Sequence, residues 1–287
     1  MGSVQLSSGT IDYEDSGGDG PVIVLVGGLL MDATLWAKVV SMLAPAHRCI
    51  VPVLPLGGHR RAMAHDADLS LHGQADLLAE LIDRLDLRDV TLVANDWGGP
   101  QLTAVRHPER LRALVLLPQE AFDNIPPGLP GAAAGVAGRV PGGIFLVVQT
   151  LRIPFMRRLP MTFGWMAKRP IPSDVVGSWI TGVRKDRRIR RDVAKYVRTS
   201  DYRGLEQAAA ELARCELPTL VLWASEDRVM PPEHGRRLAE LMPNARYAEV
   251  ADAYTLLPLD QPHEVATQVA AFVTQVHQRP SPDEPLT

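Results

Sequence analysis

The sequence has little of what marks several common classes of protein. Its 287 residues include only two cysteines, Cys49 and Cys215, which lie far apart and show no metal-ligand spacing, so we expect no disulfide framework and no metal site. No apolar stretch reaches the roughly 18 residues that suggest a membrane-spanning helix. The formal net charge is −3, which gives no global attraction to nucleic acid or to an anionic membrane.

The composition of the two ends of the chain gives two further expectations. The opening residues MGSVQLSSGTIDYED have neither a basic start nor an apolar core, so we expect no signal peptide. The scarcity of cysteine favours a reducing compartment, and together these features predict a soluble, cytoplasmic protein. Residues 278–287 are polar and proline-rich, and we expect a disordered tail.

Short apolar runs alternate with helical patterns along the first part of the chain. The runs at 21–28, 48–56, 90–95 and 112–119 are nearly all apolar, which is typical of buried parallel strands. Residues 68–87 repeat apolar side chains at helical spacing. This alternation predicts an α/β fold with a doubly wound sheet.

The alternation stops at Glu120 and resumes only near residue 218. Between them lie a Pro/Gly/Ala-rich stretch and helical segments; afterwards come strands at 218–227 and 245–250, a helix at 232–243, and a last helix from about 261. We predict a core of residues 1–119 and 212–277, with residues 120–211 forming a helical cap over the carboxyl edge of the sheet, where ligands bind. The basic run RKDRRIRR at 184–191 in this insert fits either a solvated helix face or a docking patch for an acidic carrier or substrate.

Residues 90–102, VTLVANDWGGPQL, are typical of a nucleophile elbow, in which a strand turns sharply into a helix and exposes one side chain. Ala94 and Gly98 occupy the small positions of the usual Gly-x-Ser-x-Gly pattern, and Asp96 occupies the centre. The absence of a hydroxyl at position 96 excludes a serine-type esterase or lipase. The alternative for Asp96 is a helix N-terminal residue that only satisfies the helix dipole.

Four landmarks in order resemble the α/β-hydrolase superfamily, over about residues 10 to 275. They are the strand end VLVGGLL, the elbow ANDWGG, the acid turn WASEDRVMPPEHG and the closing turn DAYTLLPLDQP. An aspartate followed by Trp-Gly-Gly is most similar to the Asp-nucleophile branch, the epoxide hydrolases and haloalkane dehalogenases. The resemblance implies an α/β-hydrolase fold with a mostly parallel sheet flanked by helices, a helical cap inserted before the acid-bearing strand, and no cofactor or metal.

The resemblance also implies roles for individual residues. Asp96 would attack carbon, because a carboxylate is ionised near neutral pH without help from a base, and the backbone N–H groups of Leu29 and Trp97 would form the oxyanion hole. Asp227 stands at the acid that orients a histidine, and Glu120 stands at a second acid position known in the dehalogenases. The alternatives are a helix-capping residue for Asp227 and a residue at the rim of the cap for Glu120.

The closing turn departs from the family pattern, since Thr255 stands where the histidine belongs and Tyr254 where a glycine belongs. A threonine hydroxyl is far too weak a base to activate water, so an ester on Asp96 would persist. His59, in the loop after the second of these strands, is the candidate for a relocated base; the alternative is a histidine on the loop surface. Tyr196 and Tyr202 in the cap, and Tyr254, are candidates to bind substrate and protonate a leaving oxygen, and core packing is the alternative for the two cap tyrosines.

Three hypotheses on function follow. The first is an epoxide-hydrolase-like enzyme acting through Asp96 on a small, mainly apolar organic substrate. The second is a non-hydrolytic isomerase, cyclase, dehydratase or lyase of secondary metabolism that uses Asp96 with Asp227 or Glu120 as acid and base. The third is a non-catalytic ligand-binding protein. We expect a small-molecule partner, no nucleic acid and no membrane, and a homodimer stays open.

Overall fold

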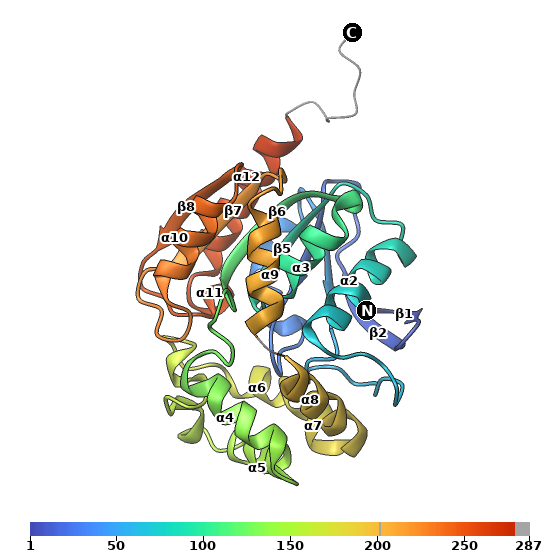
Figure 1. Cartoon of the computed structure of the whole chain (residues 1–287), viewed down its shortest axis with the longest axis vertical. Coiled ribbons are helices and arrows are strands. Elements are labelled where there is room, and N and C mark those ends of the chain that lie inside the picture. Colours follow the sequence, from blue (N-terminus) through green and yellow to red (C-terminus); the bar gives the residue numbers. More distant parts are fainter. Residues whose placement is uncertain (201, 279–287) are drawn as a thin grey trace.

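A computed structural model of the chain describes residues 1–200 and 202–278 and contains one eight-stranded sheet (Figure 1). The strand order is β1-β2-β4-β3-β5-β6-β7-β8; β1 and β2 pair antiparallel with their neighbours, and the strands from β4 to β8 are parallel. The strands are β1 (Gly2–Leu6), β2 (Gly9–Asp15), β3 (Val22–Val26), β4 (Arg48–Pro52), β5 (Val90–Asp96), β6 (Leu111–Gln119), β7 (Thr219–Ala224) and β8 (Ala245–Val250).

The predicted fold class is confirmed, and each of the six segments predicted as a strand forms one. The antiparallel pair β1 and β2 was not predicted. β1 is the edge strand and β2 lies beside it; Leu6 and Ile11 are their only buried residues, so they lack the continuous apolar run of the central strands.

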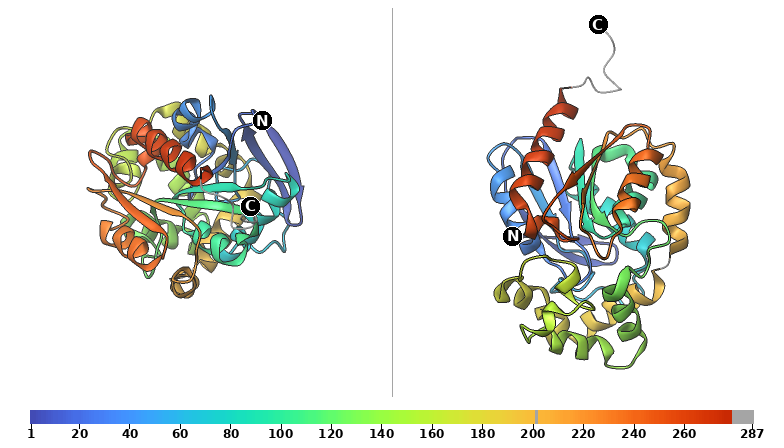
Figure 2. Two further views of the ribbon diagram at one scale, coloured as in Figure 1. Left: turned by 90° about the horizontal axis from the view of Figure 1, so that it is seen from above. Right: turned by 90° about the vertical axis from the view of Figure 1, so that its left-hand side faces the viewer.

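Helices cover both faces of the sheet. In Figure 2, α12 lies on one side of the sheet, and α9 and α10 lie on the other. Helix α1 packs against α12, whereas α2 packs against α3, and α3 against α9. The helices of the two faces are α1 (Ala37–Leu43), α2 (Leu71–Arg84), α3 (Gly99–Arg106), α9 (Tyr202–Leu212), α10 (Pro232–Leu241), α11 (Leu257–Asp260) and α12 (Pro262–His277).

The chain between β6 and β7 forms a separate layer of helices at one end of the sheet (Figures 1 and 2). We call residues 128–199 the inserted layer; its helices are α4 (Gly128–Arg139), α5 (Gly143–Thr150), α6 (Ser173–Trp179), α7 (Thr181–Lys185) and α8 (Arg187–Thr199). Helix α9, which falls within the predicted cap range 120–211, packs against the core helix α3 instead.

Small residues explain why the Gly/Ala-rich stretch forms helix α4. A side chain at Gly138 would meet Val197 of α8 at 3.0 Å, so glycine allows the two helices to pack closely. Packing against α8 therefore outweighs the weak intrinsic helix propensity of glycine.

Three other sequence expectations concern the rest of the chain. Both cysteines are free in the structure. Within the described residues, no helix is both long and apolar enough to cross a bilayer. Of the predicted disordered tail, 278–287, only Gln278 lies within the described residues, as the C-cap of α12.

Asp260 links the inserted layer to the core. Its fully buried carboxylate accepts backbone N–H bonds from Lys168 at 2.8 Å and Arg169 at 3.0 Å, and from Tyr254 at 3.1 Å. The first two donors belong to the inserted layer, and the third belongs to the turn after β8.

Asp260→Asn should destabilise the protein by roughly 1.5–3 kcal/mol, because the amide replaces a charged acceptor and brings a buried donor among N–H groups. The free energy of unfolding in urea measures the effect. Asp83→Asn is the matched control, since Asp83 pairs with Arg110 at the surface and its side chain is 54% exposed; it should change stability by less than about 0.5 kcal/mol. Equal losses in the two variants would contradict the linking role of Asp260.

Candidate active site

The site begins at the sharp turn between β5 and α3. All seven residues of β5 are buried, and the strand ends at Asp96, whose backbone has a φ of 68°. This left-handed conformation is uncommon for a residue other than glycine and costs of order 1 kcal/mol or more. The turn holds the Asp96 side chain at the carboxyl edge of the sheet, as the elbow pattern predicts.

Glycines make room for the Asp96 carboxylate and for the turn itself. A Cβ atom at Gly28 would lie 2.0 Å from Asp96 Oδ2, and one at Gly98 would lie 2.7 Å from the backbone oxygen of Glu120. Any side chain at Gly28 would therefore displace the carboxylate. The sequence GG at 27–28, where the family has His-Gly, preserves the glycine that this contact requires.

Burial dominates the electrostatics of Asp96. It raises the pKa of Asp96 to about 7; a backbone hydrogen bond from Leu29 opposes the shift, and the charge of Asp227 adds to it. The Leu29 N–H thus faces the Asp96 carboxylate, on the side where an oxyanion hole was predicted. At neutral pH the carboxyl is poised between its two protonation states.

Glu120 follows β6 and lies beside Asp96. Burial and the charge of Asp96 raise the pKa of Glu120 to about 8. Its Oε2 accepts hydrogen bonds from the Gly98 N–H at 3.5 Å and from the Tyr196 hydroxyl at 3.4 Å. Because the two carboxyl groups disfavour each other's ionisation, one holds a proton more readily while the other is charged.

Asp227 and Thr255 form a pair beside the elbow. The Thr255 hydroxyl donates to Asp227 Oδ1 at 2.8 Å, and the same oxygen accepts the N–H groups of Val229 and Met230 at 2.9 Å. Burial nevertheless raises the pKa of Asp227 to about 6, and its Oδ2 is buried with no hydrogen-bond partner among the described residues. Thr255 thus lies beside Asp227, where the resemblance implies a histidine, and the roles of both residues stay predictions.

Asn95 holds the closing turn against the elbow. Its amide Nδ2 donates to the backbone oxygen of Thr255 at 2.8 Å and to that of Pro118 at 2.9 Å. The residue before the candidate nucleophile therefore fixes the backbone of Thr255 and the end of β6.

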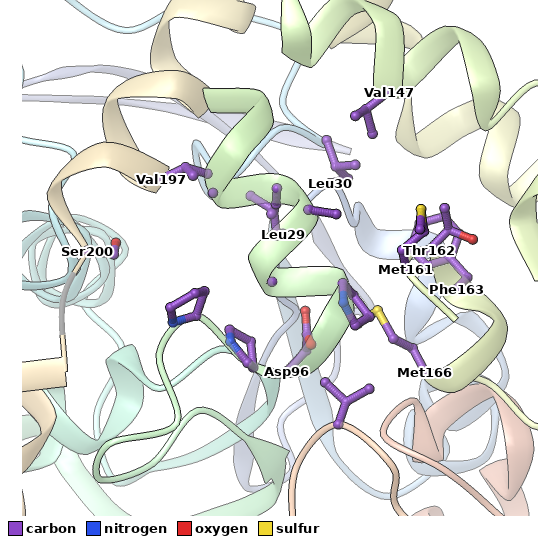
Figure 3. A pocket seen from close by; sticks show the side chains of 18 of the residues that line it. Leu29, Leu30, Asp96, Val147, Met161, Thr162, Phe163, Met166, Val197 and Ser200 are labelled. Atoms are coloured by element: carbon purple, nitrogen blue, oxygen red, sulfur yellow. The ribbon is translucent and has the colours of Figure 1, made fainter. Parts of the chain in front are cut away.

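A cavity of about 370 Å³ lies over this site, between the sheet edge and the inserted layer. Figure 3 shows Asp96 in it among apolar side chains that include Leu29, Leu30 and Met166. Asp96, Glu120, Tyr196 and Arg139 are its ionisable lining residues, and no histidine lines it within residues 1–200 and 202–278. Such a cavity suits a small, mainly apolar molecule that meets two carboxyl groups at one end.

Two aromatic candidates lie at the cavity. Trp97 is buried and lines it, and its Nε1 has no hydrogen-bond partner among the described residues. Tyr196 of α8 is 4% exposed and lines the cavity beside Glu120. Burial and the charge of Glu120 raise the pKa of Tyr196 well above its usual value, so its phenol keeps its proton.

Two other candidates lie outside the cavity lining, and the structure does not place the side chain of a third. His59 is 4% exposed rather than on the loop surface; its Nδ1 accepts the Gly57 N–H at 3.1 Å and its Nε2 lies 3.4 Å from Asp192 of α8, outside the cavity lining. Tyr254 is also absent from the lining, and its ring contacts the Arg228 guanidinium at 4.6 Å. Tyr202 begins α9, but its side chain lies outside the part of the chain that the structure describes.

Most of the residues that shape the cavity carried no recognisable signal in the sequence. They are apolar or small side chains of the inserted layer, among them Gly131, Ala134, Val147, Met161, Phe163, Met166 and Val197. The one available signal was the run of small residues at 131–135, four of which line the cavity. Within the described residues, no group of three or more His, Cys, Asp or Glu side chains is placed to hold a metal ion.

Comparison with known proteins agrees with this geometry. The model of the α/β hydrolase fold family matches residues 21–262, and the chain belongs to that family. It is 28% identical over 276 residues to a cis-3-alkyl-4-alkyloxetan-2-one decarboxylase of Shewanella oneidensis, covering 90% of this chain and 83% of the relative. It is 30% identical over 116 residues to a haloalkane dehalogenase of Mesorhizobium japonicum, covering 40% of this chain and 37% of the relative.

A solved structure gives the same fold. The crystal structure of an ancestral haloalkane dehalogenase superposes with a TM-score of 0.78 at 22% identity, covering 97% of this chain and all of the other. The resemblance to the superfamily is thus confirmed, with haloalkane dehalogenases among the relatives and the structural neighbours, and the protein is an enzyme of the α/β-hydrolase fold. The roles of individual residues stay predictions.

Glu120→Gln should stabilise the protein at alkaline pH and leave its stability at acid pH unchanged. The raised pKa means that the folded chain holds this proton more tightly than the unfolded chain, so stability falls as pH rises from about 4 to about 8. A tenfold difference in proton affinity between the two states corresponds to about 1.4 kcal/mol, and we expect a gain of roughly 2–4 kcal/mol at pH ~9. Urea unfolding at pH values of about 4 and 9 measures it.

Glu233→Gln is the control, because its side chain is 73% exposed and should give the same stability difference at both pH values. A Glu120→Gln variant that is no more stable than the parent at alkaline pH would show that Glu120 ionises as an ordinary glutamate.

Proposed function

We propose that this enzyme catalyses a non-hydrolytic proton-transfer reaction, such as an isomerisation, elimination or ring closure, on a small apolar substrate. The observation that carries the proposal is the pair of buried carboxyl groups, Asp96 and Glu120, at the end of an apolar cavity that no described histidine lines. The pair supplies a base and an acid at the same pH.

The step proposed needs no water as a reactant. An ionised Asp96 takes a proton from a carbon or hydroxyl of the substrate, and protonated Glu120 gives a proton to an oxygen that leaves or changes its bonding. After this step Asp96 is protonated and Glu120 is ionised. Transfer of a proton from Asp96 to Glu120 restores the starting state. The Tyr196 phenol, 3.4 Å from Glu120 Oε2, supports the acid by a hydrogen bond.

The position of Thr255 also supports a reaction without hydrolysis. Its hydroxyl is committed to Asp227 and cannot activate water, whereas the resemblance implies a histidine at this position in hydrolytic relatives. The relative from Shewanella oneidensis is named for the decarboxylation of an oxetanone with two alkyl groups, which is a non-hydrolytic reaction of an apolar molecule. We extend both features, a non-hydrolytic reaction and an apolar substrate, to this enzyme as part of the proposal.

A second candidate function is the opening of an epoxide by covalent attack of Asp96. The strained turn that presents Asp96 and the Leu29 N–H that faces its carboxylate favour it. This function predicts an ester on Asp96 that persists, because the site holds no evident base to hydrolyse it.

Conversion of styrene oxide in heavy-oxygen water tests the proposal. We expect an isomer of styrene oxide and no diol, no mass adduct on the protein, and losses in kcat of roughly 10²-fold or more for both Asp96→Asn and Glu120→Gln. A styrene oxide adduct on wild-type protein that Asp96→Asn abolishes would favour the second candidate instead, and diol containing solvent oxygen would contradict the proposal.

The Thr255→His variant tests whether hydrolysis can be gained, because it puts an imidazole beside Asp227. If a base is what hydrolysis lacks, this variant should form labelled diol from styrene oxide, and Thr255→Ser should not. Labelled diol from the Thr255→Ser variant would show that water is activated elsewhere in the site.

A further inference from the structure

The inserted layer carries an unusual concentration of exposed apolar side chains. Apart from Met1 and Met42, every exposed large hydrophobic side chain of the described residues belongs to residues 129–161. Phe155 is 70% exposed, Leu146 63% and Ile153 50%. Apolar side chains gathered on one segment of the surface mark an interaction site more often than chance exposure. We call this the apolar docking surface: Leu129, Val136, Val140, Phe145, Leu146, Ile153, Phe155 and Met161.

The same segment is basic. Residues 124–173 contain no aspartate or glutamate, although the whole chain has a net charge of −3. Arg139, Arg152 and Arg157 bond to backbone oxygens or neutral side chains, and neither they nor Arg158 have a carboxylate partner among the described residues. The net charge, on which the expectation of no membrane partner rested, does not reveal this local distribution.

A cationic hollow lies beside Phe155. A second cavity of about 460 Å³ is lined by Arg157, Arg158, Lys168 and Arg169, together with Phe155. Lys168 and Arg169 form ion pairs with Glu226 and Asp252. The uncompensated positive charge of the hollow therefore comes from Arg157 and Arg158. Guanidinium groups bind phosphate oxygens well, since their donors match that geometry.

We propose that the apolar docking surface binds an anionic phospholipid bilayer. Its aliphatic and aromatic side chains would enter the interface, and the arginines beside them would contact lipid phosphates. The active-site cavity opens on this surface, because Leu146 and Met161 both line the cavity and are more than half exposed. An apolar substrate could then pass from the lipid into the cavity without crossing water.

The charges favour a bilayer over a second copy of the chain. Two copies that met through this surface would bring the same unpaired arginines together, which disfavours a self-complementary interface. A bilayer satisfies both features of the surface at once, since it offers hydrocarbon to the apolar side chains and phosphate to the arginines. The proposal does not depend on the reaction proposed above, because its test measures binding and not turnover.

Co-sedimentation with vesicles tests the proposal. Wild-type protein should bind vesicles of equal parts phosphatidylglycerol and phosphatidylcholine, bind pure phosphatidylcholine far less, and dissociate as salt rises. Arg152→Gln with Arg158→Gln should weaken binding about fivefold for each arginine. Ile153→Ser with Phe155→Ser should weaken it roughly tenfold or more, because both side chains would otherwise leave water.

Two variants are matched controls. Met42→Ser removes an exposed apolar side chain outside the apolar docking surface, and Arg88→Gln removes an exposed arginine in the turn that follows α2. Both should bind vesicles as the wild type does. Failure of wild-type protein to bind the anionic vesicles, or equal losses in the control variants, would overturn the proposal. So would a dimer in solution that the Ile153→Ser/Phe155→Ser change dissociates, because the surface would then face a second copy.

Discussion

The burial of Asp96 and Glu120 against each other is the constraint on which the rest of the site depends. Carboxylates removed from water disfavour ionisation, and each makes the other harder to ionise. The fold holds both by its backbone: β5 ends in a left-handed residue, Gly28 leaves room for the Asp96 carboxylate, and β6 brings Glu120 to the same edge. Such an arrangement costs stability, which the buried central strands offset.

The acid turn, which carries Asp227, and the closing turn, which carries Thr255, meet beside Asp96. In this chain Asp227 receives the Thr255 hydroxyl, and Asn95 fixes the Thr255 backbone, so the position beside the acid is filled by a group without basicity. The fold of the α/β hydrolase family is therefore kept, with the Thr255 hydroxyl and not an imidazole beside Asp227. The inserted layer adds an apolar wall and the Tyr196 phenol beside Glu120.

The sequence predicts the core of the fold and the turn at Asp96 well, because both depend on local patterns. Continuous apolar runs predict the strands from β3 to β7, and the small residues around Asp96 predict the elbow. The edge strands β1 and β2 have no such run. Glu120 could be placed only through the resemblance to dehalogenases, since nothing local distinguishes it from a surface glutamate. Its contact with Asp96 depends on the register between β5 and β6.

The inserted layer was the least predictable part, because its lining residues are ordinary apolar side chains without a motif. The environment of His59 was also not predictable from the sequence. Its position in a loop suggested an exposed side chain, but His59 is buried and lies beside Asp192 of α8.

The most direct test of the carboxyl pair is a ¹³C NMR titration of protein labelled at the aspartate and glutamate side-chain carboxyls. The account predicts two carboxyl signals with apparent pKa values of about 7 and about 8, of which Asp96→Asn removes one and Glu120→Gln the other. In the Asp96→Asn variant the Glu120 signal should titrate at lower pH, because the charge of Asp96 is one cause of its raised pKa. Titration of both groups below about pH 5 in the wild type would contradict it, because two ordinary ionised carboxylates could not supply an acid at neutral pH.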